Sequence, residues 1–176
     1  MTLTVVLKRM ALFAAIVLAW ALIVAMARAA TPQREIVAFA GFAPGTVVVK
    51  TGERRLYYVL DGARALRFPV GVGRSGQAWS GTSRIEGKFV RPAWSPPEEI
   101  RRDHPNLPDV IAGGARDNPM GAAALTLNGG EYAIHGTNRP SSIGGFVSYG
   151  CIRMYNRDII ALYRLVDIGT PVVVAP

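Results

Sequence analysis

Cysteine is almost absent from this 176-residue chain, in which Cys151 is the only one. A single cysteine excludes an internal disulfide, so packing and hydrogen bonding must hold the fold together. A lone thiol is either a small buried hydrophobic group or a reactive one. The cysteine count alone does not distinguish a structural thiol from a reactive one, so the residues around Cys151 must be considered.

Runs of basic residues are also absent, although the formal net charge is +8. The lysines and arginines are scattered, and no aromatic residues interleave with them in a stripe of the kind that binds nucleic acid. We therefore expect no nucleic-acid partner. A mild positive field suits an anionic surface such as a cell wall or a membrane, and it is equally consistent with simple solubility.

The chain has little that would hold a metal or a cofactor. His104 and His135 are its only histidines, and together with Cys151 they lack the paired spacing of zinc sites. The glycine-rich run 71–73 leads into no predicted helix, which argues against a dinucleotide-binding turn. We predict neither a metal nor a cofactor.

One long hydrophobic run is present, at the N-terminus. Residues 10–27 are apolar, Lys8 and Arg9 precede them, and Ala27-Arg28-Ala29 follows as a cleavage-site pattern. Residues 1–30 are therefore predicted to be a secretory signal cleaved after Ala29, or an uncleaved membrane anchor. Both place residues 31–176 outside the cytoplasm, in the periplasm or cell wall. The inner membrane is a partner only if the segment is retained.

The remaining sequence predicts a mainly β fold, a single sandwich or barrel-like domain with one clear helix near the C-terminus. β-Branched and apolar runs separated by turn residues indicate the strands, and an apolar period after Asn156, a candidate N-cap, indicates the helix. Residues 76–108 are predicted to be irregular, with one helical turn at 98–103, because prolines interrupt them. The predicted strands are 46–50, 54–60, 65–72, 122–127, 131–134 and 171–174.

Chemistry is concentrated between His135 and Cys151. The histidine ends a predicted strand, and the cysteine follows a glycine sixteen positions later, after a loop long enough to fold back. A neighbouring imidazole can take the proton of a thiol and so generate the nucleophilic thiolate. Backbone N–H groups at Gly150 and Cys151 could face a developing oxyanion. Arg153 shares a face with Cys151 in an extended segment and could bind a carboxylate. In an exported chain a lone cysteine in this setting is predicted to be catalytic.

These residues resemble a known family. The segments 134–138 (Ile-His-Gly-Thr-Asn) and 148–154 (Ser-Tyr-Gly-Cys-Ile-Arg-Met) are similar to those of L,D-transpeptidases with a YkuD-type catalytic domain. Weaker landmarks at 92–97, 118–121 and 169–172 extend the resemblance to roughly residues 46–174. The resemblance implies a β-rich sandwich or barrel.

The resemblance also implies roles. Cys151 would be the nucleophile and His135 the general base and acid, oriented by the backbone carbonyl of Gly136. Gly150 would shape the loop and the oxyanion site. The residues implied to contact or shape the substrate site are Asn138, Ser148, Tyr149 and Arg153. The family commonly has a histidine where this chain has Tyr149, and tyrosine cannot act as a base near neutral pH. We expect activity to survive and substrate preference or rate to differ.

The implied reaction belongs to peptidoglycan synthesis, and so to cell-wall biogenesis and cell shape. The cysteine attacks the stem-peptide bond before the terminal D-alanine, and an amine resolves the thioester to form a cross-link. Carboxypeptidase activity, attachment of a protein to the wall, and an inactive wall-binding domain remain as alternatives. A sortase fits poorly because its histidine and arginine lie much farther from its cysteine, and papain-like hydrolases have the cysteine first.

Overall fold

The computed structural model describes residues 10, 13–14, 16–17, 20, 34–130 and 132–176. Residues 34–176 form one compact unit. In the described part of the chain, no helix has both the length and the hydropathy to cross a membrane. Most of the predicted signal or anchor, residues 1–30, lies outside the described residues, so that assignment stays a prediction.

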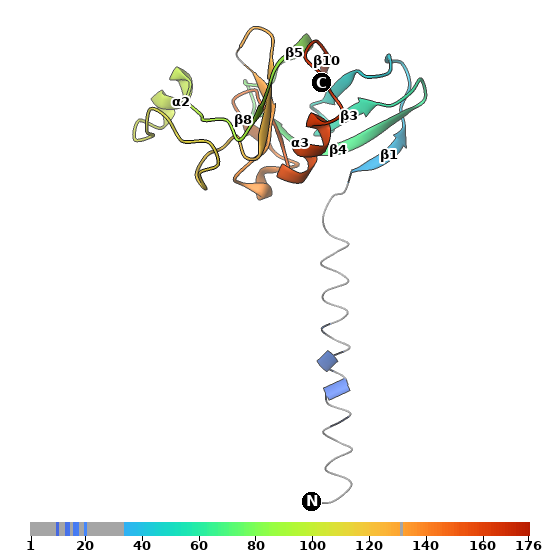
Figure 1. Ribbon diagram of the computed structural model, residues 1–176, viewed down its shortest axis with the longest axis horizontal. Helices are drawn as coiled ribbons and strands as arrows, with labels where there is room; N and C mark the ends of the chain where they lie inside the picture. The colour runs from blue at the N-terminus through green and yellow to red at the C-terminus, as the bar shows by residue number, and fades with distance from the viewer. Residues whose placement is uncertain (1–9, 11–12, 15, 18–19, 21–33, 131) are drawn as a thin grey trace, which may run out of the picture. The chain divides into compact units, whose positions relative to one another are not determined.

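The fold is mainly β, as the sequence predicts. Its elements, in chain order, are β1 (Glu35–Ala38), β2 (Val47–Lys50), β3 (Arg55–Val59), β4 (Arg64–Gly73), β5 (Gly81–Val90), α2 (Glu98–Asp103), β6 (Ala123–Leu127), β7 (Ala133–His135), η1 (Pro140–Ser142), β8 (Phe146–Ser148), β9 (Ile152–Met154), α3 (Asn156–Tyr163) and β10 (Pro171–Ala175) (Figure 1). The strands pair in the order β4-β3-β2-β10-β5-β6-β7-β9, and β9 returns to β4, which closes a barrel. β1 and β8 also pair with β4.

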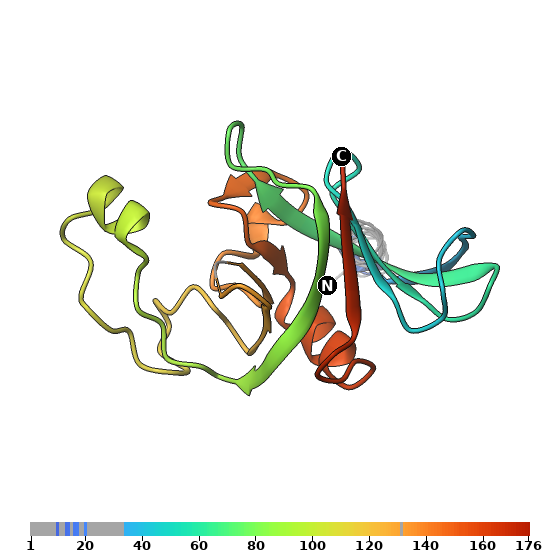
Figure 2. The same ribbon diagram turned by 90° about the horizontal axis from the view of Figure 1, so that it is seen from above.

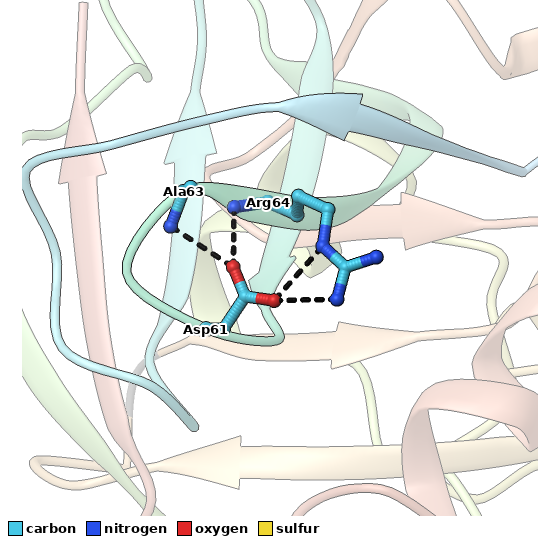
Figure 3. A network of polar contacts seen from close by, with 3 residues as sticks. All are labelled: Asp61, Ala63 and Arg64. Atoms are coloured by element: carbon cyan, nitrogen blue, oxygen red, sulfur yellow. Dashed lines mark hydrogen bonds and ion pairs between the residues drawn. The ribbon is translucent and has the colours of Figure 1, made fainter.

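Strands β2, β3 and β4 form the antiparallel meander that the sequence predicts. The turn between β3 and β4 is held by Asp61, whose Oδ1 accepts hydrogen bonds from the backbone N–H groups of Ala63 (2.9 Å) and Arg64 (2.8 Å) (Figure 3). Its Oδ2 accepts two further bonds from the Arg64 guanidinium, at 2.9 and 2.7 Å. An aspartate at a turn commonly satisfies the backbone in this way, and it fixes the register of the hairpin.

Strand β2 has an unbroken run of valines because each of its two faces packs against a separate hydrophobic cluster. Val47 and Val49 point into the barrel, while Val48 points outward into a second cluster with Tyr57. Alternate residues of a strand face opposite sides, so a strand buried on both faces reads as a continuous apolar run. The outer cluster is covered by the segment that follows β1, where the Phe39 ring stacks on Tyr57 at 4.3 Å.

Strand β4 changes partners along its length and thereby closes the barrel. Its first half pairs with β1 and β3 up to Pro69, and its second half pairs with β9 through Val70 and Gly71. The second half also pairs with β8 at Val72 and Gly73. This closure brings β9, which directly follows Cys151, against the middle of the barrel wall.

The prediction of an irregular stretch over residues 76–108 is wrong in its first part, because residues 81–90 form the long strand β5. Local pattern hides this strand, since only Ile85 and Gly87 along it are buried and the remaining side chains are partly or fully exposed. Pairing with β6 on one side and β10 on the other defines it.

Residues 91–122 form a long connection that leaves the strands and carries α2 on its far side (Figure 2). A bridge between Trp94 and Ile111 holds the two arms of this connection together. The predicted helical turn at 98–103 is confirmed as α2. Asn118 is buried, and its amide donates to the carbonyls of Pro92, Ile111 and Ala112.

The predicted C-terminal helix is confirmed as α3, but its N-cap differs from the prediction. The helix begins at Asn156 and Tyr155 precedes it as the cap residue, without a side-chain capping bond. Ile159 and Leu162, together with Val166 beyond the helix, are buried in the barrel core. The Asn156 side chain therefore does not cap the helix and instead bonds the backbone at Thr137.

Candidate active site

Strand register brings the histidine and the arginine together. β7 and β9 run parallel, with Ile134 opposite Ile152 and His135 opposite Arg153. The two isoleucines lie in the barrel core. His135 and Arg153 therefore face the other side of the sheet, and Cys151, two positions before Arg153, belongs to the same side. This is the arrangement that the spacing of the sequence motif suggests.

His135, Cys151 and Arg153 line one cleft of about 380 Å³. The connection 91–122, the Cys151 loop and the β4–β5 connection all contribute residues to the lining of this cleft. The remaining lining residues are Gln77, Trp94, Pro97, Glu99, Ile100, Pro119, Met120, Gly130, Tyr132, Ser148 and Tyr149. A volume of this size can hold a few amino-acid residues of a peptide.

Burial sets the protonation of His135 and Cys151. The His135 side chain is buried, and burial followed by the nearby Arg153 charge lowers its pKa to about 4. Burial raises the pKa of the Cys151 thiol, while the Ala133 backbone and the Arg153 charge oppose that change. Both groups are therefore neutral at pH 7 in the free protein. Such a thiol needs a base to become a nucleophile, and a neutral imidazole can serve as one.

The orientation of the imidazole depends on the backbone around it. His135 Nδ1 is buried and has no hydrogen-bond partner in the part of the chain that the structure describes. The backbone groups of Gly136 and Pro119 nevertheless lie where they favour the protonated ring and oppose the lowering of its pKa. The orienting bond from Nδ1 to the Gly136 carbonyl therefore stays a prediction.

Ser148 shapes the loop that presents the cysteine. Its hydroxyl donates to the Cys151 carbonyl (2.6 Å) and accepts the Gly150 N–H (3.2 Å). The Gly150 N–H is thus already used inside the loop. Of the two N–H groups that the sequence suggested for an oxyanion, the Gly150 N–H is therefore the less available one.

Position 150 requires glycine for two reasons, its backbone conformation and the close approach of a neighbouring side chain. Its φ is +116°, and a Cβ built there would lie 2.3 Å from the Tyr132 ring. Tyr132 cannot easily retreat, because it stacks on Trp79 with ring centroids 4.9 Å apart. Trp79 in turn donates from Nε1 to the Gly150 carbonyl (3.0 Å). Two aromatic rings therefore fix the residue before the cysteine.

We expect Gly150→Ala to lower the free energy of unfolding by about 2–4 kcal/mol, because it adds a clash to backbone strain. Gly169→Ala is the matched control, since Gly169 has a φ of +90° and open space around its Cα. It should cost about 1–2 kcal/mol from strain alone. Equilibrium urea unfolding measures both. Equal losses for the two variants would show that the Tyr132 contact is unimportant.

Asn156 holds the turn after His135, a role that the sequence did not reveal. Its Oδ1 accepts the backbone N–H groups of Ala122 and Thr137, both at 3.0 Å, and its Nδ2 donates to the Thr137 carbonyl at 3.0 Å. A Cβ at Gly121 or Gly136 would lie 2.2 Å from this Oδ1. The Asn156 carboxamide thus bonds the backbone groups just beyond His135 that would otherwise need a neighbouring strand. The position of Asn156 at the start of a helix had suggested a helix cap instead.

Replacing Asn156 by alanine is expected to lower the free energy of unfolding by about 2 kcal/mol, because three backbone groups lose their partner. Asn138→Ala provides the comparison: the exposed Asn138 amide donates to the Asp117 carbonyl at 2.9 Å, and its loss should cost less than about 1 kcal/mol. Urea unfolding of both variants tests this ranking. A smaller effect at Asn156 than at Asn138 would contradict it.

The remaining predicted site residues have different placements. Asn138 lies against the connection 91–122, outside the residues that line the cleft. Tyr149 lines the cleft, its hydroxyl donates to Asp103 Oδ2, and the Arg74 guanidinium lies 3.9 Å from its ring centre. Arg74 also bonds Asp103 at 3.0 Å. Tyr149 therefore ties α2 to the cysteine loop, in addition to any contact with substrate.

No metal centre accompanies the cleft among the described residues: they contain no group of three or more His, Cys, Asp or Glu side chains placed to hold an ion. His104, in the loop after α2, is exposed.

Residues 44–174 match the YkuD family, the L,D-transpeptidase catalytic domain. The chain is 38% identical over 135 residues to the probable L,D-transpeptidase YbiS of Escherichia coli K12, a match that covers 72% of this chain and 43% of that protein. It therefore spans about two fifths of the length of such curated relatives. An L,D-transpeptidase from Mycobacterium smegmatis has the same fold, with a TM-score of 0.60, 19% identity, and coverage of 74% of this chain and 58% of that one.

A solved structure from Brucella melitensis, named as a probable carnitine operon oxidoreductase, is also similar. Its TM-score is 0.55 and its identity 34%, with coverage of 81% of this chain and 94% of that one. In the described part of this chain, the glycine-rich run 71–73 does not lead from a strand into a helix, as a dinucleotide-binding turn would. The glycine run 71–73 lies inside β4, and the next element along the chain is the strand β5.

Proposed function

Since this chain belongs to the L,D-transpeptidase family, we propose that it is a cysteine-dependent transpeptidase acting on peptidoglycan stem peptides. The convergence of the sole cysteine and a buried, neutral histidine in one cleft carries this proposal. A structural cysteine would need no such base beside it. Arg153, on the same face, adds a positive charge suited to a peptide carboxylate.

In the first step the Cys151 thiol transfers its proton to His135, and the sulfur attacks the carbonyl carbon of the third stem residue, an L-configured centre. The negative charge of the tetrahedral intermediate is stabilised by the Cys151 N–H. His135 then returns the proton to the nitrogen of the terminal D-alanine. The carbon–nitrogen bond breaks, D-alanine leaves, and a thioester remains on Cys151.

In the second step an amine of another stem peptide attacks the thioester. The neutral His135 accepts a proton from this amine, and the sulfur leaves and is protonated again. The product is an amide cross-link, and the free thiol is restored. His135 alternates between base and acid in both steps, which its low pKa permits because the ring gives up its proton readily.

The proposal is tested by incubating residues 30–176 with disaccharide tetrapeptides and analysing the muropeptides by mass spectrometry. Cross-linked dimers and released D-alanine are expected. Protein alkylated with iodoacetamide is the control, because Cys151 is its only thiol. Tripeptide without dimers would identify a carboxypeptidase. Binding to peptidoglycan without any turnover would identify a wall-binding domain and refute the proposal.

We further propose that the catalytic residues work outside the cytoplasm, exported by residues 1–30. Mass analysis of the protein from a membrane-bounded expression host distinguishes the two forms. A mature N-terminus at Ala30 indicates a cleaved signal, and an intact N-terminus in the membrane fraction indicates an anchor. An intact chain in the cytoplasm would refute export.

A further inference from the structure

The cleft carries two opposite charges, those of Arg153 and Glu99. The buried Nε of Arg153 has no hydrogen-bond partner among the described residues. Glu99 is the only carboxylate among the described lining residues. Neither residue takes part in a salt bridge within the described part of the chain. Charges held in a cleft and left uncompensated are available to a ligand.

Glu99 is held in position rather than left to swing in solvent. Gln77 Nε2 donates to its Oε1 at 2.7 Å, and both side chains are half-buried. This bond occupies one carboxylate oxygen and leaves Oε2 for a ligand. Because Gln77 lies two residues before Trp79, which bonds the Gly150 carbonyl, the same short segment supports both Glu99 and the cysteine loop.

The helix that carries Glu99 presents one face to this region. Glu99 and Asp103 are four positions apart in α2, so they lie on the same side of the helix. Asp103 accepts the hydroxyl of Tyr149, two residues before Cys151. Two contacts from one helix face, one at each end, therefore fix α2 along the cleft. The neighbouring Glu98 is exposed and outside the lining.

We propose that Glu99 is a specificity-determining residue that binds an ammonium group of the substrate, while Arg153 binds a carboxylate. This inference rests on the proposed function and names the chemistry of its substrate: a peptide that carries both a cationic and an anionic group near the bond that reacts. The ammonium belongs either to the side chain of the third residue of the acyl donor or to the amine of the acceptor. A carboxylate in a partly desolvated cleft attracts such a group more strongly than one in water does.

The test compares Glu99→Gln with Glu98→Gln, which removes the same charge from the same helical turn outside the cleft. The probe is a tetrapeptide stem with diaminopimelate in the third position, and the readout is D-alanine release without an acceptor. If the ammonium belongs to the donor, Glu99→Gln should raise KM about tenfold and leave kcat nearly unchanged. The same donor with its side-chain amine acetylated should show no difference between variant and wild type.

If the ammonium belongs to the acceptor, D-alanine release from the donor alone should be unchanged. The KM for acceptor in cross-link formation should then rise about tenfold in Glu99→Gln. Unchanged values in both assays, or equal changes in Glu98→Gln, would overturn the proposal.

A binding measurement separates this proposal from the proposed function. Calorimetry on Cys151→Ala protein, with and without Glu99→Gln, reports the affinity for the tetrapeptide whether or not the protein is catalytic. Weaker binding caused by Glu99→Gln, about tenfold, supports the ammonium site even if wild type has no turnover. Equal affinity, or no binding to either protein, overturns it. Absent turnover with intact Glu99-dependent binding would refute only the transpeptidase reaction.

Discussion

The Cys151→Ala protein is expected to release no D-alanine from tetrapeptide stems and to form no covalent adduct with a carbapenem. Carbapenems mimic the acyl donor of this family, so they should acylate the wild-type thiol and add the mass of one drug molecule. Cys151 is the only cysteine in the chain, and no second thiol can replace it. Turnover should fall by at least about 10³-fold, because removing the nucleophile abolishes the covalent route.

Intact-mass spectrometry decides the result, with Cys151→Ser as the matched control. Serine preserves the size and polarity of the side chain in the half-buried loop, so loss of acylation in both variants would reflect chemistry and not misfolding. Circular dichroism should show the same β content in all three proteins. No adduct on wild type, or the same adduct on the alanine variant, would refute the role of Cys151 as nucleophile.

Replacing His135 by glutamine is expected to slow carbapenem acylation at pH 7 by about 10²–10⁴-fold, the usual contribution of a general base. Burial raises the pKa of the Cys151 thiol, so the thiolate is a minor species at pH 7 without a base. We expect the neutral imidazole to act as that base in the wild type.

The pH profile distinguishes this role from a structural one. In wild type the acylation rate should rise with pH through the His135 pKa of about 4 and then level off through neutrality. In His135→Gln it should instead keep rising, close to tenfold per pH unit, because only the thiolate can react. A plateau in the variant at neutral pH would show that His135 is not the base.

The same histidine links stability to pH. Folding lowers the pKa of His135 from 6.5 to about 4, so the unfolded chain binds the extra proton between these values. The contribution of the neutral ring is therefore complete above pH 6.5 and is lost as the pH falls toward 4, by up to about 3 kcal/mol. His135→Gln should lack this part of the pH dependence, which urea unfolding at several pH values measures. Acylation rates should be compared only where both proteins remain folded.

The hydrophobic pattern of the sequence was sufficient to predict most strands and the helix α3. β2, β3 and β4 are rich in β-branched or aromatic residues and are bounded by turn residues, so each strand can be recognised within its own sequence. β5 could not be, because its side chains are mostly polar and exposed. Its strand character comes from hydrogen bonds to β6 and β10, which are about 40 and 90 residues away in the chain.

The candidate site divides in the same way. The sequence by itself was enough to predict Cys151, His135 and Arg153 as site residues, because their residue types and spacing are local and the chain has only one thiol. Only the tertiary structure decided what surrounds them. Asn156 at the turn after His135 lies 21 positions from that histidine. Tyr132 and Trp79 lie 18 and 71 positions before Gly150, and Glu99 lies 52 positions before Cys151. Residue types and their spacing can predict a nucleophile from the sequence. The burial and pKa of that residue, and the charges that line its cleft, arise only when distant segments pack together.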